Sequence, residues 1–278
     1  MPSDYVYHSN FWLEEPEETN PFAAKACYCH GYDVYGQIIA RASWFEYLLL
    51  MFKGDRPEPA NVVLLEKLAL VLANAGPKEA SIRAAMNGGV AGTNHSSALM
   101  AALAVGSGLY GGSQELEICM RLWRECQQDV EKWKTRLQSP EEDERADIWP
   151  AMEHPPGFDP NGDQIPTTLL QSLELLIQFA PESGALAWLA NNRSHLEEFF
   201  GCPLSISAVA AATFVDLGLD QDQGSMLYLM LRLPGAAVHA VEQRKMGWKK
   251  FPFYSPAIEL EDDPGPYKKA GEGETDES

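Results

Sequence analysis

Apolar residues recur at every third or fourth position along most of this chain, and this spacing constrains the fold more than any other feature. In GQIIARASWFEYLLLMFKG (residues 36–54) they include Ile38, Phe45, Leu49 and Phe52, and Gly54 follows with prolines beyond it. Such spacing places apolar side chains on one face of an α-helix, and glycine and proline end helices. The sequence therefore predicts a helix here.

The same spacing predicts helices along the rest of the chain, whereas no segment shows the two-residue alternation of a strand or a hairpin turn. We therefore expect an all-α protein. One of these helices is rich in Ala, Ser and Gly, and such small side chains let two helices approach closely. The predicted helical segments are 36–54, 59–76, 96–112, 113–139, 165–180, 184–201, 205–219 and 221–247. Between residues 125 and 165 the sequence is acidic and then proline-rich, which indicates a long loop of the kind that often carries function.

The charge of the chain excludes several classes of partner. The formal net charge is −19 and the pI is about 4.6. Phosphate binding requires clustered Lys and Arg, so we expect neither nucleic acid nor an anionic membrane as a partner. The longest apolar stretch, residues 98–105, is shorter than the ~18 residues that span a bilayer. No signal peptide precedes it, so we expect a reducing, cytoplasmic location.

Cysteine spacing gives little support for a metal site. Cys27 and Cys29 lie two positions apart with His30 beside them, which is suggestive of zinc ligands. However, no second Cys/His pair follows at the spacing that zinc sites use. We therefore expect no metal.

A glycine pair marks the first candidate functional site. In SGLYGGSQE (residues 107–115), Tyr110 stands directly before Gly111 and Gly112 at the start of a predicted helix. Glycines at a helix N-terminus let a ligand approach the backbone closely. A phenol with a reference pKa of ~10 is a poor base at neutral pH, but it donates hydrogen bonds well.

Several segments, taken in order, resemble the citrate synthase family, and most closely its short citryl-CoA lyase-like branch. They include CHGYDVYGQIIARASWFEYLLLMFKG, GSGLYGGSQE, PPGFDPNGDQIP, VDLGL and LMLRLPGAAVHAVEQ, and together they cover roughly residues 31–267. The resemblance implies a helical fold with two domains. The large domain would contain residues 1–110 and 206–278 with a C-terminal arm near residues 249–254, and the small domain residues 111–205.

The resemblance also implies an obligate dimer whose cleft binds a CoA thioester and a carboxylic acid, with no permanently bound cofactor. In that family a carboxylate takes a proton from the carbon next to the thioester. One histidine donates to the thioester oxygen, a second acts on the other carbonyl, and arginines hold the carboxylates of the acid. Such chemistry requires a base, a donor at the developing oxyanion and fixed positive charge.

This sequence departs from the family pattern at most of those positions. The His-Gly-Gly turn of the family is Tyr110-Gly111-Gly112 here, and its Gly-Phe-Gly-His loop is replaced by Gly157-Phe158-Asp159-Pro160. The catalytic aspartate falls at Ser207, and an arginine of the loop falls at Ile165. His154 precedes two prolines upstream of the loop, so no histidine is expected at the turn.

The positions that match are Gly111, Gly112, Glu115 and Arg232, the last of which falls where the family has a carboxylate-binding arginine. Because a buried arginine needs a partner, Arg232 either binds a ligand carboxylate or pairs with an acidic side chain. We favour the ligand.

Three further assignments stay open. Tyr110 either contacts a ligand or packs between domains. Asp159 either replaces the lost base or is a solvated turn residue before Pro160. His95 either faces the cleft as a substrate-binding residue or simply begins a helix that Thr93 or Asn94 caps.

Two functional hypotheses follow. In the first, the protein makes or breaks a C–C bond beside a CoA thioester with a rearranged site, in which Tyr110 and Asp159 are catalytic and Arg232, Gly111, Gly112 and His95 bind substrate. In the second, it is a catalytically inactive subunit that pairs with an active homologue, since a dimer interface depends on helix packing and not on site chemistry.

Overall fold

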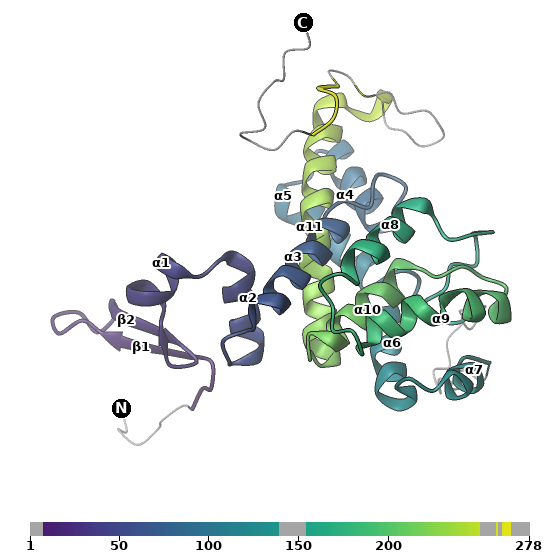
Figure 1. The fold of residues 1–278 in the computed structure, drawn as a ribbon. Helices are drawn as coiled ribbons and strands as arrows, with labels where there is room; N and C mark the ends of the chain where they lie inside the picture. The colour runs from purple at the N-terminus through teal and green to yellow at the C-terminus, as the bar shows by residue number, and fades with distance from the viewer. Residues whose placement is uncertain (1–7, 139–153, 251–259, 261–262, 268–278) are drawn as a thin grey trace, which may run out of the picture.

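The computed structural model describes residues 8–138, 154–250, 260 and 263–267. Its helices lie around α11 (Gln221–Met246), which runs through the middle of the molecule (Figure 1). The other α-helices are α1 (Ile39–Arg41), α2 (Trp44–Lys53), α3 (Pro59–Leu72), α4 (Ala80–Val90), α5 (His95–Gly106), α6 (Ser113–Cys126), α7 (Val130–Gln138), α8 (Thr167–Leu176), α9 (Ala185–Phe200) and α10 (Ile206–Asp216). The expectation of a helical fold is confirmed.

Two helical cores meet along α11. The larger contains buried side chains from α2, α3 and α6 to α11, among them Leu49, Leu116 and Phe214. The smaller joins α4 and α5 to the second half of α11. Residues on both sides of position 111 share the larger core, and the division into a large and a small domain stays a prediction.

Small residues hold the smaller core together. A side-chain carbon on Gly88 of α4 would lie 3.1 Å from the Cα of Ala98 on α5, and one on Gly89 would lie 2.4 Å from the backbone oxygen of Ala240. The close helix approach that the Ala/Ser/Gly-rich segment predicts is therefore confirmed.

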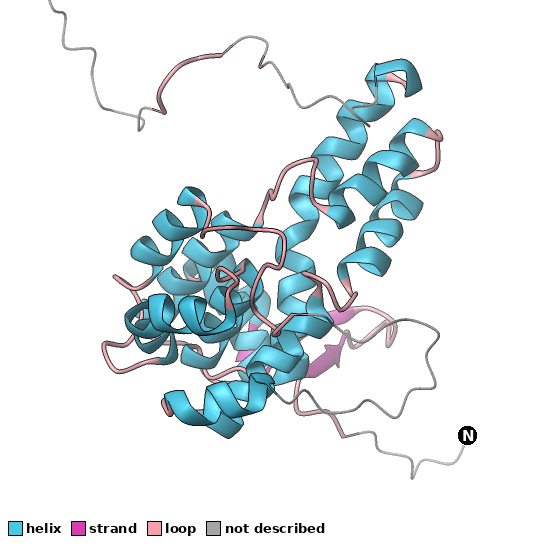
Figure 2. Ribbon diagram, turned by 90° about the vertical axis from the view of Figure 1, so that its right-hand side faces the viewer, coloured by secondary structure: helices cyan, strands magenta, loops and turns pink. Residues whose placement is uncertain are grey.

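The expectation that strands are absent is wrong near the N-terminus. There β1 (Trp12–Pro16), β2 (Ala24–Cys29) and β3 (Tyr32–Asp33) form an antiparallel sheet in the order β1-β2-β3, beside the helices (Figure 2). Most of β1 is exposed, so it lacks the alternation that identifies a strand. In β2 the buried residues are Cys27 and Cys29, which behave as small apolar side chains.

Cys29 is thus part of a small third core that it shares with Val34, Ile38 and Leu50. Across the described residues, no group of three or more His, Cys, Asp or Glu side chains is placed to hold a metal ion. In the same residues, every helix is too short or too polar to cross a membrane. Residues 251–254 of the predicted C-terminal arm lie outside the described residues.

Two long predicted helices are in fact divided. The segment 36–54 contains a π-helical turn, η1 (Val34–Ile38), then α1, and the chain is extended at Ala42 before Ser43 caps α2 by accepting a bond from Glu46 N. The segment 113–139 divides at Gln127, whose φ is +50°. A further helix, α4, was not predicted, because Asn87, Gly88 and Gly89 weaken its periodicity.

Three tryptophans fix α7 on α6 and α9. The rings of Trp123 and Trp133 lie 4.8 Å apart, and Trp188 lies 5.3 Å from the first and 5.9 Å from the second. The indole nitrogens of Trp133 and Trp188 donate to the backbone oxygens of Gln127 and Gln128. The break between the two helices is thereby held in one conformation.

Candidate functional site

In the turn between α5 and α6, there is no room for a side chain at Gly112. A side-chain carbon on Gly112 would lie 2.2 Å from the backbone oxygen of Gly108 and 2.7 Å from that of Gly106. Gly111 has a φ of +70°, the left-handed region that favours glycine. These two residues let the chain double back tightly and begin α6 directly at Ser113.

Glu115, in the first turn of α6, joins this turn to the proline-rich loop. One oxygen of its carboxylate accepts a hydrogen bond of 2.6 Å from Gly111 N, and the other accepts one of 2.7 Å from Gly157 N. The side chain is only 2% exposed. A carboxylate is suited to this position because it offers two acceptors to two buried N–H groups.

Gly157 is itself closely surrounded. Its φ is +90°, and a side-chain carbon there would lie 2.9 Å from Cβ of Ala208 and 3.2 Å from Sγ of Cys119. Its oxygen accepts from Ser205 N, so the loop is also attached to the start of α10.

Tyr110 lies on the open side of the turn, beside a histidine. Its side chain is 59% exposed, and its ring centroid lies 5.8 Å from that of half-buried His154, with the two planes inclined by 34°. The expectation that no histidine lies at the turn is therefore wrong. The loop returns far enough along Tyr110 to place His154 there, although the two prolines separate it from Gly157.

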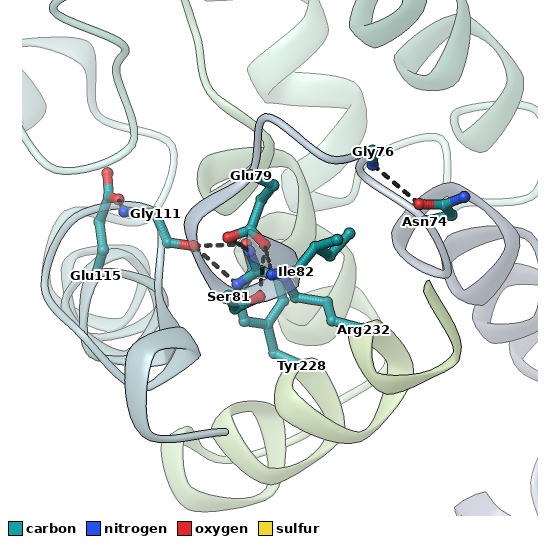
Figure 3. Close-up of polar contacts among 9 residues, drawn as sticks. All are labelled: Asn74, Gly76, Glu79, Ser81, Ile82, Gly111, Glu115, Tyr228 and Arg232. Atoms are coloured by element: carbon teal, nitrogen blue, oxygen red, sulfur yellow. Dashed lines mark hydrogen bonds and ion pairs between the residues drawn. The ribbon is translucent and has the colours of Figure 1, made fainter. Parts of the chain in front are cut away.

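Gly111 is also bound from the opposite side, by α11. Its oxygen accepts hydrogen bonds from Arg232 Nη1 at 2.9 Å and from Tyr228 Oη at 3.2 Å. The guanidinium of Arg232 lies over the ring of Tyr228, 4.7 Å from its centroid. Figure 3 shows these groups meeting at the turn.

The second nitrogen of Arg232 forms an ion pair with Glu79 (Nη2 to Oε1, 2.6 Å). Glu79 is the residue before α4, where it caps the helix by accepting from Ile82 N at 2.9 Å and from Ser81 Oγ at 2.5 Å. Burial, the largest single effect, raises its pKa. The charge of Arg232 and the hydrogen bonds outweigh burial, so the pKa of Glu79 is below its ordinary value.

Arg232 was expected either to bind a ligand carboxylate or to pair with an acidic side chain, and in the structure it pairs with Glu79. Arg232 is 8% exposed. The void beside it, lined in part by Ser81, Gly106 and Leu233, measures only about 10 Å³. A ligand carboxylate would have to displace Glu79 in order to bind it.

Asp159 lies in the proline-rich loop, and Ser207 lies in the first turn of α10. Oδ1 of Asp159 accepts from Asn161 N at 2.9 Å, which makes Asp159 a turn-forming residue. Ser207 is fully buried, and its hydroxyl lies 2.7 Å from that of Ser205. Among the described residues, neither side chain has a hydrogen bond or ion pair with Tyr110 or Arg232.

His95 is the exposed first residue of α5. Asn94 caps this helix by accepting from Ser97 N at 2.8 Å, which confirms one of the two predicted caps. His95 has no hydrogen bond or ion pair with the residues around Gly111 in the described part of the chain.

The structure therefore joins Gly111 to Arg232 by a hydrogen bond, beside Gly112 and the exposed ring of Tyr110, and leaves Asp159 and His95 without a hydrogen bond to these residues in the described part of the chain. Sequence reasoning missed Glu79, Tyr228 and the position of His154. No local pattern pointed to Glu79, because the helix that it caps was not predicted and Arg232 is 153 positions away. A cavity of about 340 Å³ between α6 and α7 is lined by residues such as Glu125 and Lys132 and not by this site.

The arrangement of the helices is that of a citrate synthase-like fold, and comparison with solved structures confirms it. The citryl-CoA lyase from Hydrogenobacter thermophilus superposes with a TM-score of 0.66 at 16% identity, covering 95% of this chain and 97% of that one. The sequence-based resemblance is thus confirmed at the level of the fold.

Two structures of ATP citrate lyase have the same fold over part of their length. A mutant from Methanosaeta concilii in complex with (3S)-citryl-CoA matches at 13% identity with a TM-score of 0.66, covering 88% of this chain and 40% of that one. The enzyme from Methanothrix soehngenii in complex with citrate and coenzyme A matches at 13% identity with a TM-score of 0.68, covering 96% and 44%. No protein-family model and no curated protein matches the sequence.

Proposed function

We propose that this protein binds a CoA thioester of a carboxylic acid at the Tyr110–Gly112 turn, and makes or breaks the C–C bond next to the thioester. Proteins with the same fold have been solved with (3S)-citryl-CoA and with citrate and coenzyme A. By the sequence resemblance, the turn and the loop that begins at Gly157 are the two segments that carry the reacting groups.

The single observation that carries the proposal is the bridge made by Glu115. Its carboxylate holds Gly111 N and Gly157 N at 2.6 and 2.7 Å. A buried carboxylate with two backbone donors keeps the two segments at a fixed separation. Such preorganisation is what a site that stabilises a developing charge requires.

Each predicted site residue has a role in this proposal. The exposed hydroxyl of Tyr110 donates to the thioester oxygen as negative charge develops there. Gly111 and Gly112 let the thioester approach the backbone. Arg232 binds the carboxylate of the acid when Glu79 is displaced, Asp159 is the candidate base on the loop, and His95 contacts the distal part of the ligand.

One observation favours the second hypothesis, an inactive subunit. The aspartate position of the family is filled by buried Ser207, whose hydroxyl is engaged by Ser205. The charge of Arg232 is already neutralised by Glu79. A protein with these substitutions could keep the fold and pair with an active homologue.

Both hypotheses include a dimer, and α11 provides a surface for it. Met226, Met230, Val238 and Val241 are 42–65% exposed and recur at intervals that place them along one side of the helix. We propose that this stripe contacts a second copy of the chain or a related subunit. Light scattering should give twice the chain mass of 30.7 kDa, and replacing Met230 and Val238 by Asp should give the monomer.

The function is tested by offering citryl-CoA and related 3-hydroxyacyl thioesters to the purified full chain, with products followed by mass spectrometry. Turnover that Tyr110→Phe and Asp159→Asn abolish supports the rearranged site, and turnover untouched by both removes these residues from it. Activity that arises only on mixing with a homologue supports the inactive-subunit hypothesis. Absence of thioester binding would contradict the proposed thioester chemistry and leave only the inactive-subunit hypothesis.

A further inference from the structure

His154 is a titratable side chain at the candidate site. Among the described residues it forms no hydrogen bond and no ion pair, and its ring lies against that of Tyr110. The imidazole is half-buried. Both ring nitrogens are therefore available to a ligand that reaches the exposed phenol of Tyr110.

The backbone that carries this imidazole is attached to the rest of the site. Pro155 and Pro156, which have restricted φ angles, connect it to Gly157. Gly157 is in turn held by Glu115 on its N–H and by Ser205 on its oxygen. The same carboxylate that orients the Tyr110 turn thus also orients the segment that presents His154.

Three other side chains in or next to the two segments already have partners. Both carboxylate oxygens of Glu115 accept backbone N–H bonds, Oδ1 of Asp159 accepts from Asn161 N, and the hydroxyl of Ser207 lies against Ser205. Histidine is also the side chain that exchanges protons most readily near neutral pH.

We propose that His154 is the proton-transfer group of this site, acting beside the Tyr110 hydroxyl on a 3-hydroxyacyl CoA thioester. The inference rests on the proposed function and deepens it, because it assigns to His154 the proton transfer for which Asp159 was the candidate, and Oδ1 of Asp159 already accepts from Asn161 N. His154 lies outside the motif positions on which the sequence resemblance depends.

The step balances without any other reactant. In the cleavage direction the neutral imidazole takes the proton of the 3-hydroxyl group, the C2–C3 bond breaks, and the oxygen at C3 becomes a carbonyl. The electron pair of the broken bond forms the thioester enolate, whose oxygen accepts a hydrogen bond from Tyr110. The imidazolium then returns its proton to C2, which leaves an acyl thioester, a carbonyl product and neutral His154.

Proton exchange at C2 tests this role directly. The full chain is incubated with acetyl-CoA in D₂O, deuterium in the acetyl group is followed by mass spectrometry, and binding of acetyl-CoA is measured separately by calorimetry. We expect His154→Gln to lower the exchange rate at least about 100-fold, as loss of a general base does, with binding changed less than about threefold. Exposed His195 on α9 provides the matched control, and His195→Gln should leave exchange and binding unchanged.

Added imidazole should restore part of the exchange in His154→Ala, which a merely structural role would not allow. Exchange that persists in His154→Gln would overturn the assignment of His154 and leave the proposed function standing. Wild-type protein that binds acetyl-CoA without exchange would overturn it too and favour the inactive subunit. If the wild type does not bind the thioester, the proposed function fails, and the role of His154 fails with it.

Discussion

Glu115 and Gly157, 42 positions apart in the chain, are joined by a buried hydrogen bond of 2.7 Å. The other oxygen of the same carboxylate holds Gly111, so one side chain sets the separation of the two segments that form the candidate site. On the far side of Gly111, Arg232 and Tyr228 bind its oxygen. Gly111 is thus held through both its backbone N–H and its backbone oxygen.

Replacement of Glu115 by Gln should therefore weaken both stability and thioester binding. Glutamine offers one acceptor oxygen and turns an N–H donor toward the other backbone N–H, so one buried donor loses its partner. We expect the free energy of unfolding to fall by about 1–3 kcal/mol, as measured by urea denaturation.

The matched control is Glu117→Gln on the same helix, since the side chain of Glu117 has no hydrogen bond or ion pair in the described part of the chain. It should change stability by less than about 0.5 kcal/mol. Equal effects of the two substitutions would show that the bridge contributes nothing specific.

The ion pair of Glu79 predicts an acid-sensitive component of stability. Its pKa is lower in the folded protein than its ordinary value of 4.5, so the unfolded chain binds more protons in the range between the two. The contribution is complete above the ordinary value and is lost as pH falls through the folded value. We expect Glu79→Gln to be less stable than wild type at pH 7 and to lose less stability between pH 5 and pH 3.

Chemical denaturation across that pH range measures the effect. Burial raises the pKa of Asp216, so this carboxyl makes stability fall as pH rises, which is the opposite of the effect of Glu79. The Asp216 carboxyl is present in both proteins, and its effect cancels in the comparison. As a control, Glu174→Gln at an exposed position of α8 should reproduce the wild-type dependence of stability on pH. Parallel curves for wild type and Glu79→Gln would exclude a coupled Glu79–Arg232 pair.

Tyr228 predicts the opposite dependence at alkaline pH. Burial raises the pKa of its phenol to about 12, although the nearby charge of Arg232 lowers it. The unfolded chain therefore releases this proton near pH 10 and the folded protein does not, so stability falls as pH rises from 10 toward 12. Tyr228→Phe should flatten that decline, and it should cost about 1 kcal/mol at pH 8 through the lost bond to Gly111 O.

Denaturation midpoints between pH 8 and pH 11 provide the measurement. Tyr35, which is 67% exposed, supplies the control, because Tyr35→Phe should leave the decline unchanged. An unaltered alkaline slope in Tyr228→Phe would contradict a buried neutral phenol.

The tryptophan cluster should account for much of the stability of the α6–α7–α9 region. Trp133 is 6% exposed and contacts both Trp123 and Trp188. We expect Trp133→Ala to lower the free energy of unfolding by about 3–5 kcal/mol. Trp133→Phe should cost less because it keeps a ring and loses only the bond to Gln127 O, and a smaller loss for Ala than for Phe would disprove this account.

The helices could be predicted from sequence because each buries a face whose apolar residues recur at helical spacing, as Phe45, Leu48 and Leu49 do in α2. The sheet could not, because the buried residues of β2 are cysteines and β1 is exposed. The breaks at Ala42 and Gln127 also escaped prediction. Both breaks interrupt an otherwise continuous apolar pattern, so they can be recognised only from the backbone conformation.

The candidate site was predictable only where its chemistry is local. The glycine pair at 111 and 112 indicated a tight turn, and the structure contains that turn. The partners of that turn, Glu79 and Tyr228, come from distant segments, and no local pattern encodes their approach. His154 was set aside because two prolines follow it, whereas the loop that they belong to brings it to Tyr110.

Calorimetric titration of the full chain with a CoA thioester tests the central claim most directly, namely that the turn and loop joined by Glu115 form a thioester site. The account predicts saturable binding, one thioester per chain, with a dissociation constant below about 1 mM, weakened at least tenfold by Tyr110→Ala. Absence of saturable binding, or equal affinity in wild type and Tyr110→Ala, would contradict it.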